Sequence, residues 1–339
     1  MKPSVSTPNA DSPILLMAPF RGLTHKSWRN AYAMHFGGFE RMFAPFVTGV
    51  GTETVSFNKL TDLVPKNLMV SPTVPQIIGT NPKEIIVFAK AVAEYGYTEL
   101  NWNLGCPFAR IANKKRGCGI LPYPEMLDEI LGKVFREIPI RLSIKTRLGY
   151  HHPEEILKVL PVFNKYPLHE LILHPRTGKM GYRGNADVQA YAICQKHSVH
   201  PLIYNGDIYS LSRFEKLSQL LPEQTTWMIG RGALINPFLP LQIRGVLLKD
   251  QEKRTSLESF HFELWHQACE TQKHESRILG AMKAIWHYMA GVFSNGQEAF
   301  TRIKRAKTKT AYFDAVEAAF QQNFANDDAL ETYFMQLTK

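Results

Sequence analysis

Eight short apolar segments recur along the first two thirds of the chain, and a segment with helical spacing follows most of them. The strand candidates are Ile14 to Ala18, Arg41 to Val47, Val74 to Ile78, Glu99 to Asn103, Arg141 to Thr146, Glu170 to His174, Pro201 to Asn205 and Thr226 to Ile229. The helix candidates are Pro82 to Tyr95, Pro124 to Phe135, Glu154 to Phe163, Ala186 to His197 and Leu211 to Leu221. Strands that alternate with helices pair in parallel, and eight such units predict a closed (β/α)8 barrel, the TIM barrel, rather than an open sheet.

The length of the chain fits such a barrel with an appendage. A barrel of this type takes about 250 residues, and the chain has 339. We therefore expect an α/β barrel domain over residues 1–250 and a smaller C-terminal α-helical domain over residues 251–339. No apolar run approaches the roughly 20 residues that span a bilayer, and the N-terminus lacks a continuous signal-peptide core, so the expected location is cytoplasmic, with no membrane partner.

The four cysteines give no metal or disulfide pattern. They are widely spaced and include no Cys-x-x-Cys pair: Cys106, Cys118, Cys194 and Cys269. We expect no metal site, although a single bridge stays open at this point.

The charge is unevenly distributed. The chain carries 40 basic and 30 acidic residues, a net charge of +10, which makes a polyanionic partner plausible. Residues 251–339 hold 11 of each sign, so the excess lies in the barrel. That tail still contains one basic run without an acid, formed by Arg302, Lys304, Arg305, Lys307 and Lys309. Such a run is either a solvated helix face or a contact for a polyanionic partner.

Cys106 stands where the fourth strand candidate ends, between Gly105 and Pro107. Strand pairing stops at such a sequence, so the thiol is expected at a turn. It is either a buried apolar turn residue or an acid or nucleophile at the site where barrel enzymes keep their chemistry.

Other polar residues occupy the same position relative to their strands. These residues lie at or just beyond the carboxyl ends of the strand candidates: Pro19, Gln76, Asn103, Cys106, Lys145, Arg147, His174, Arg176, Asn205, Asp207, Gly230 and Arg231. Each alone has a structural explanation. Together they predict one site, because the carboxyl ends of barrel strands form one face.

Two of these strand ends predict a phosphate cradle, and two others predict contacts with a flavin ring. The sequences Asn205-Gly206-Asp207 and Gly230-Arg231 follow the last two strands, where glycine lets backbone N–H groups approach an anion. Lys145 would be a buried cation in need of an anionic partner, which reduced isoalloxazine supplies, and Gln76 can bond a ring edge. The set favours FMN over a dinucleotide.

The motifs, in this order and spacing, resemble those of the dihydrouridine synthases, flavoenzymes that reduce uridines in RNA, usually tRNA. They are Met-Ala-Pro-Phe-Arg-Gly at 17–22, Asn-Leu-Gly-Cys-Pro at 103–107, Ile-Lys-Thr-Arg-Leu-Gly at 144–149, His-Pro-Arg-Thr at 174–177, Gly-Tyr-Arg-Gly at 181–184, Asn-Gly-Asp at 205–207 and Met-Ile-Gly-Arg-Gly-Ala at 228–233. The tail resembles the family's helical domain less sharply, through residues 281–289 and the basic run.

The resemblance implies a reaction and a role for each site residue. Hydride would pass from N5 of reduced FMN to C6 of uracil, Cys106 would protonate C5, and NADPH would reduce the flavin again. Asn103 and Arg147 would hold the uracil, with Tyr182 near the flipped base and Arg176 on the substrate side. The flavin ring and its chain would contact Pro19, Gln76, Lys145 and His174, and its ribityl and phosphate end would contact Asn205, Gly206, Asp207, Gly230 and Arg231. Arg302, Lys304, Arg305 and Lys307 would contact RNA, and the protein is expected to act as a monomer.

The chain departs from the family pattern beside the cysteine. Phe108 and Ala109 stand where the family has a small residue and a lysine, Arg110 is the nearest cation, and residues 114–119 read Lys-Lys-Arg-Gly-Cys-Gly. We expect this stretch on a loop near the RNA, with Cys118 structural.

Three alternatives stay open from the sequence. One is a barrel flavoenzyme for a free small molecule of the dihydropyrimidine or dihydroorotate type. Another is the same chemistry on ribosomal RNA. The third is an RNA-binding module that has lost its chemistry.

Overall fold

A computed structural model describes residues 12–64 and 71–337. The N-terminal segment on which the expected lack of a signal peptide depends lies outside these residues. Within them, one sheet of parallel strands has the order β3-β2-β1-β9-β8-β7-β6-β5-β4. The strands are β1 (Ile14–Met17), β2 (Arg41–Phe43), β3 (Thr73–Val74), β4 (Gln76–Ile77), β5 (Glu99–Leu104), β6 (Arg141–Gly149), β7 (Leu171–Thr177), β8 (Leu202–Tyr204) and β9 (Thr226–Ile229).

The sheet closes into a barrel through the chain itself. The two ends of the strand order, β3 and β4, are separated by Pro75 alone. Proline has no N–H to donate to a ladder, so one strand position is split into two short pieces. β3 pairs with β2, and β4 pairs with β5. The predicted (β/α)8 barrel is confirmed, with this split as a detail that the prediction of one strand from Val74 to Ile78 missed.

The predicted helices are confirmed with shifts of one or two residues at their ends. They are α3 (Pro82–Glu94), α5 (Pro124–Val134), α6 (Glu155–Phe163), α7 (Val188–His197) and α8 (Leu211–Leu220). Helix α7 starts at Val188 because the Asp187 side chain caps it by accepting a bond from the backbone N–H of Ala190. Further helices in the barrel region are α1 (Lys26–His35), α2 (Phe57–Leu60), α4 (Ala109–Ala112), α9 (Arg231–Ile235) and α10 (Leu239–Ile243).

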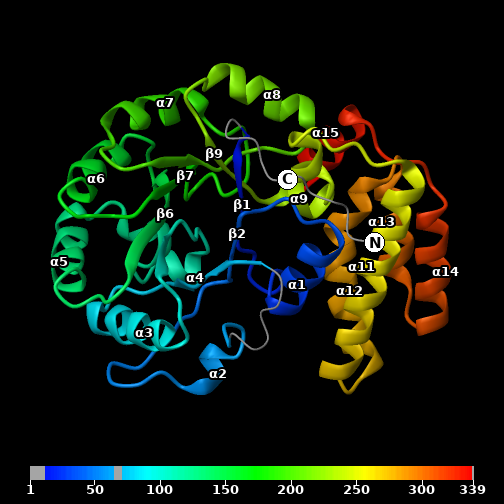
Figure 1. The fold of residues 1–339 in the computed structure, drawn as a ribbon, viewed down its shortest axis with the longest axis horizontal. Coiled ribbons are helices and arrows are strands. Elements are labelled where there is room, and N and C mark those ends of the chain that lie inside the picture. Colours follow the sequence, from blue (N-terminus) through cyan, green and yellow to red (C-terminus); the bar gives the residue numbers. More distant parts are fainter. Residues whose placement is uncertain (1–11, 65–70, 338–339) are drawn as a thin grey trace.

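The chain continues into a helical tail. Its helices are α11 (Asp250–Thr271), α12 (Glu275–Met289), α13 (Gly296–Arg305), α14 (Lys309–Phe320) and α15 (Asp327–Gln336). Figure 1 shows the tail on one side of the barrel, with α11 next to α1. Phe260 of α11 packs edge-on against Phe36 with ring centroids 5.0 Å apart, and His35 bonds Glu263 at 2.7 Å. Barrel and tail therefore share one continuous apolar core.

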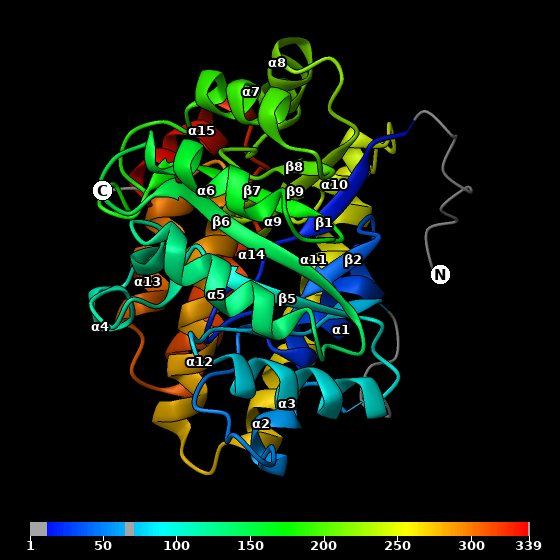
Figure 2. The same ribbon diagram turned by 90° about the vertical axis from the view of Figure 1, so that its left-hand side faces the viewer.

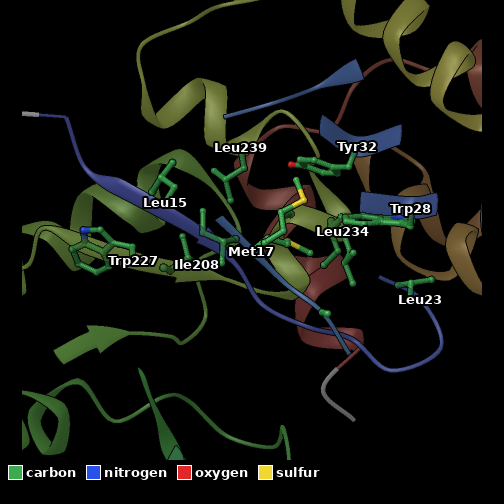
Figure 3. Close-up of a cluster of buried hydrophobic side chains, with 14 of the residues drawn as sticks. Leu15, Met17, Leu23, Trp28, Tyr32, Ile208, Trp227, Leu234 and Leu239 are labelled. Atoms are coloured by element: carbon green, nitrogen blue, oxygen red, sulfur yellow. The ribbon is translucent and has the colours of Figure 1, made fainter. Parts of the chain in front are cut away.

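Strand β1 shows how the alternation of side chains builds two cores. Figure 3 shows the side chains of Leu15 and Met17 in the same cluster as Trp28 and Tyr32 of α1. Leu16, one residue away, belongs instead to the small cluster that includes Ile172 of β7 and Met228 of β9. A strand places successive side chains on opposite faces, so the first cluster lies under the outer helices and the second fills the barrel.

The β4 to β6 part of the barrel is filled with polar side chains instead. Asn103 donates to Gln76 at 2.8 Å, Gln76 donates to Asn101 at 2.7 Å, and Asn101 donates to Ser143 at 2.9 Å. Ser143 donates to Glu99 at 2.6 Å. Buried polar groups are stable only when they are bonded to one another, so this chain of bonds fixes the amide orientations that reach the barrel mouth.

Ion pairs close the opposite end of the barrel. Arg41 contacts both Glu99 and Glu170, each at 2.7 Å. Both carboxylates are almost fully buried. Removing Arg41 would leave two buried charges without a cation, which identifies this cluster as structural rather than catalytic.

Candidate functional site

The carboxyl ends of the strands surround a cavity of about 250 Å³. Thirteen residues predicted for the catalytic, flavin or uracil site line it: Pro19, Gln76, Asn103, Cys106, Lys145, Arg147, His174, Tyr182, Asn205, Gly206, Asp207, Gly230 and Arg231. They come from the carboxyl ends of seven different strands and from the loops that follow them, and they lie up to 212 positions apart in sequence. The barrel fold is what brings them together.

Cys106 sits on a loop that is held rigidly. Oδ1 of Asn103 accepts bonds from the backbone N–H groups of Gly105 at 3.1 Å and Cys106 at 3.0 Å. The thiol of Cys118 donates to the carbonyl of Cys106 at 3.2 Å. Gly117 has φ +58°, and a Cβ there would lie 2.5 Å from that carbonyl. The backbone of Cys106 is therefore fixed by its neighbours in the loop.

The thiol of Cys106 stays protonated at neutral pH. Burial raises the pKa of Cys106, and the positive charges of Arg147, Arg21 and Arg110 only partly oppose this effect. Only 6% of the residue is exposed. A cysteine in this environment suits proton donation better than nucleophilic attack, which requires the thiolate.

Lys145 is a cation without a partner. It is on β6 and lines the cavity, and none of the described residues forms an ion pair with it. Burial, together with the neighbouring charge of Arg147, lowers the pKa of Lys145 from 10.5 to about 7. A buried ammonium without an anion is unfavourable, so this position suits an anionic ligand.

Two arginines bind Asp207, which follows β8 and lines the cavity. Arg176 binds its two carboxylate oxygens at 2.8 and 2.6 Å, and Arg231 approaches one of them at 3.3 Å. Asp207 itself has φ +45°, a left-handed conformation that a tight turn requires. The ion pairs hold the Asn205-Gly206-Asp207 turn in place.

Arg176 does not line the cavity. It is 1% exposed, and besides Asp207 it bonds the carbonyls of Arg183 and Gly184. Its Nη1 also lies 3.0 Å from Nε2 of His174. Because arginine only donates, Nε2 must accept and the imidazole proton lies on Nδ1. Burial and four surrounding cations hold the pKa of His174 well below its usual range, so the ring is neutral.

Arg231 is clamped between two aromatic rings. Its guanidinium carbon lies 4.4 Å from the ring centroid of Tyr182 and 4.2 Å from that of Phe334. Its Nη1 is buried and has no hydrogen-bond partner among the described residues. The start of helix α9 packs closely against Ile208. A Cβ on Gly232 would lie 1.8 Å from the carbonyl oxygen of Ile208, so only glycine fits at this position.

The cavity as a whole is positively charged. Arg21, Lys145, Arg147 and Arg231 line it, against a single carboxylate, Asp207, among the described residues. Of the three nitrogens of the Arg147 guanidinium, Nε and Nη1 bond backbone carbonyls, and Nη2 has no partner in the described part of the chain. An anionic ligand balances such a cavity.

Several lining residues were missed from the sequence. Phe20, Arg21 and Phe46 come from the loops after β1 and β2. Phe108, which was expected only on a loop near the RNA, also lines the cavity. Tyr288 of α12 and Phe334 of α15 reach the cavity from the tail. An aromatic residue in an amphipathic helix carries no signal for this, because the docking of tail on barrel decides which rings face the cavity.

The basic run of the tail is outside the cavity. Arg302 forms an ion pair with Glu298 at 2.6 Å, an acid one helical turn before the run. Lys304, Arg305 and Lys307 are exposed and form no ion pair with the described residues. Arg302, Lys304 and Arg305 lie in the last turn of α13, where positive charges also interact favourably with the helix dipole.

Neither a metal site nor a membrane span is present in residues 12–64 and 71–337. No group of three or more histidine, cysteine or acidic side chains there is arranged to hold a metal ion. No helix in the same ranges is long and apolar enough to cross a membrane.

Known proteins resemble this chain in sequence and in fold. The sequence profile of the dihydrouridine synthase (Dus) family matches residues 16–329. tRNA-dihydrouridine synthase B of Pasteurella multocida is 27% identical over 242 residues, which cover 68% of this chain and 72% of that protein. tRNA-dihydrouridine(16) synthase of Neisseria meningitidis serogroup B is 24% identical over 303 residues, covering 86% and 90%. Among solved structures, the old yellow enzyme homologue of Zymomonas mobilis superposes with a TM-score of 0.52 at 11% identity, covering 73% of this chain and 91% of that one, a likeness of fold alone.

Proposed function

The chain belongs to the tRNA-dihydrouridine synthase family, and on this premise we propose that it reduces uridines in tRNA to 5,6-dihydrouridine, with FMN as cofactor and NADPH as reductant. The observation that carries the proposal is the cavity at the barrel mouth. There the buried, protonated Cys106 thiol shares one cavity with the ammonium of Lys145, which forms no ion pair with the described residues, and with Nη1 of Arg231, which has no hydrogen-bond partner among them.

The residues present fit FMN at both ends. Among the described residues, Lys145 has no anionic partner where the ring would lie, and Nη1 of Arg231 has no acceptor where the phosphate would lie. Neutral His174 has an Nδ1–H to donate. Gly206 and Gly230 also line the cavity. When bound and reduced, FMN would supply a hydride from N5 to C6 of uracil.

Cys106 would hold the second hydrogen of the reaction. Hydride addition at C6 leaves negative charge on C5 and the C4 carbonyl, so an acid is needed at C5. The raised pKa of Cys106 keeps the thiol protonated at neutral pH. The backbone of Cys106 is held in place by its N–H, which donates to Asn103, and by its carbonyl, which accepts from the Cys118 thiol. After donation the thiolate would lie near Arg147, whose charge favours it.

Asn103 and Arg147 would orient the uracil. Nδ2 of Asn103 uses one hydrogen for Gln76, and its other hydrogen has no acceptor among the described residues. Nη2 of Arg147 is likewise unused. Both can donate to uracil carbonyls, while the Tyr182 ring offers a face to an extruded base. Arg176, which does not line the cavity, would act on the substrate only by holding Asp207 and His174.

The tail, residues 251–339, would help to bind the RNA. Tyr288 and Phe334 already connect it to the cavity, and Lys304, Arg305 and Lys307 offer exposed charge to phosphates. A base within folded RNA must be extruded to reach the cavity, so contacts outside the cavity are needed to offset the cost of unstacking.

The test compares substrates with one preparation of flavin-loaded protein. Unmodified tRNA, ribosomal RNA and free uracil are each incubated with NADPH or NADH, and NADPH oxidation is compared with dihydropyrimidine formed, measured by mass spectrometry. The proposal predicts product in tRNA and a rate that falls steeply with salt, since phosphate contacts release counterions. Product from free uracil alone, insensitive to salt, would instead identify a small-molecule oxidoreductase.

A further inference from the structure

A large aromatic side chain stands exposed at the rim of the cavity. Phe108 lines the cavity two residues after Cys106, yet it is 57% exposed. Isolated exposed apolar residues are common on protein surfaces and need no explanation. Phe108 differs from these because of its place at the mouth of a site that must receive a planar base.

The backbone under Phe108 is rigid. Its carbonyl accepts bonds from the N–H groups of Ile111 at 2.8 Å and Ala112 at 2.9 Å, which starts helix α4. Ile111 packs with Cys106 and Ile78 in a small buried cluster. The Phe108 ring is therefore presented on a fixed support next to the catalytic loop, and little order is lost when a ligand packs on it.

A rim of cations follows Phe108. Arg110, Lys114, Lys115 and Arg116 form no ion pair with the described residues, and no acid occurs in the sequence between Cys106 and Glu125. The ammonium of Lys115 lies 4.0 Å from the ring centroid of Tyr123, itself 40% exposed. Unpaired cations interleaved with exposed rings are typical of surfaces that bind single-stranded nucleic acid.

This rim and the tail flank the cavity from two sides. Helices α4 and α13 lie on the same side of the molecule in Figure 2 and are well separated across it in Figure 1. An RNA segment whose target base enters the cavity would then meet α13 on one side and the Phe108 rim on the other.

We propose that Phe108 stacks against a nucleotide next to the target uridine while Arg110 and Lys114 bind the adjoining phosphates. This proposal rests on the proposed function and adds a residue that helps to select and hold the substrate strand. Stacking accepts every base because each has a π face, so Phe108 adds affinity and position more than sequence preference.

The test replaces Phe108 by Ala, Leu and Trp in the full-length, flavin-loaded protein and measures binding of unmodified tRNA by fluorescence anisotropy. We expect Phe108→Ala to weaken binding about tenfold, Phe108→Leu to weaken it similarly, and Phe108→Trp to keep it. Phe57→Ala is the matched control, since Phe57 is 61% exposed but does not line the cavity. Thermal midpoints verify that each variant is folded.

A second pair of variants tests the phosphate contacts. Arg110→Gln with Lys114→Gln should lower the slope of log affinity against log salt by about 2, because each phosphate contact releases about one counterion. Lys158→Gln with Lys216→Gln, two exposed lysines on the outer helices α6 and α8, should leave the slope nearly unchanged.

The outcomes separate this proposal from the proposed function. If wild-type protein forms dihydrouridine in tRNA and Phe108→Ala binds tRNA as tightly as wild type, the Phe108 proposal is overturned and the function stands. Equal binding by the Leu and Trp variants would likewise overturn stacking. If wild-type protein neither binds nor modifies tRNA, both proposals are wrong.

Discussion

Replacing Lys145 by methionine should stabilise the flavin-free protein while it weakens flavin binding. Methionine has about the length of the lysine stem but no charge. In the flavin-free protein the ammonium of Lys145 has no anionic partner among residues 12–64 and 71–337, and burial lowers its pKa from 10.5 to about 7. The charged lysine therefore lowers the stability of the flavin-free folded protein. Such a cost is expected of a residue whose role is to bind a ligand.

The size of this cost follows from the pKa. A difference between 10.5 and about 7, at about 1.4 kcal/mol for each pKa unit, gives at most about 5 kcal/mol. Water in the open cavity screens the charge, so about 2 kcal/mol is a realistic expectation. Below pH 7 both the folded and the unfolded chain carry the proton, and the folded chain bears the full cost. Between pH 7 and 10.5 the folded chain binds fewer protons than the unfolded chain, so its stability rises with pH.

The assay is urea unfolding of flavin-free wild type and Lys145→Met at pH 6.5, 8 and 9.5. The variant should have the higher midpoint at pH 6.5, and the gap should narrow as the pH rises. Fluorescence titration with FMN on the same samples should show weaker binding by the variant. A gap that is absent or independent of pH would refute the account of an unpaired buried ammonium.

Three further predictions concern other parts of the site. Asp207→Asn should lower the free energy of unfolding by about 3–5 kcal/mol, because it leaves the buried Arg176 guanidinium unpaired. Urea unfolding measures this loss, and an unchanged urea midpoint would contradict the role of that ion pair. Iodoacetamide should alkylate exposed Cys269 faster than Cys106 at pH 7.5, and the Cys106 rate should still be rising above pH 9, since its pKa is raised; peptide mass spectrometry measures both, and faster labelling of Cys106 would indicate a nucleophile. Glutamine at Lys304, Arg305 and Lys307 together should weaken tRNA binding and its salt dependence with flavin content unchanged, whereas an unchanged affinity would assign this run to a solvated helix face.

The sequence predicts the barrel because its signal is local. Apolar runs, capped helices such as α3 and glycines after strands can each be recognised within a few residues, and parallel pairing follows from their alternation. The ends of strands are harder to predict from nearby residues. Strands β6 and β7 continue to Gly149 and Thr177, past the predicted ends at Thr146 and His174, because the two strands pair with each other beyond those residues.

The site was predictable wherever a residue ends a strand, and less so wherever a distant partner decides its role. Arg176 was expected on the substrate side, but the carboxylate of Asp207, 31 positions away, takes up its guanidinium. Phe334 lies 103 positions after the Arg231 that it covers, and nothing in the sequence of α15 indicates that contact. Such pairings depend on how the tail docks, which periodicity does not encode.

The most direct test of the central claim is a count of dihydrouridine in unmodified tRNA after single-turnover reaction with the reduced, flavin-loaded protein, comparing wild type with Cys106→Ala. The account predicts dihydrouridine with wild type, and nearly none with Cys106→Ala although that variant still binds flavin and tRNA, because C5 then lacks its acid. Full product from Cys106→Ala would contradict the role of Cys106, and no product from wild type with bound flavin and tRNA would contradict the reaction itself.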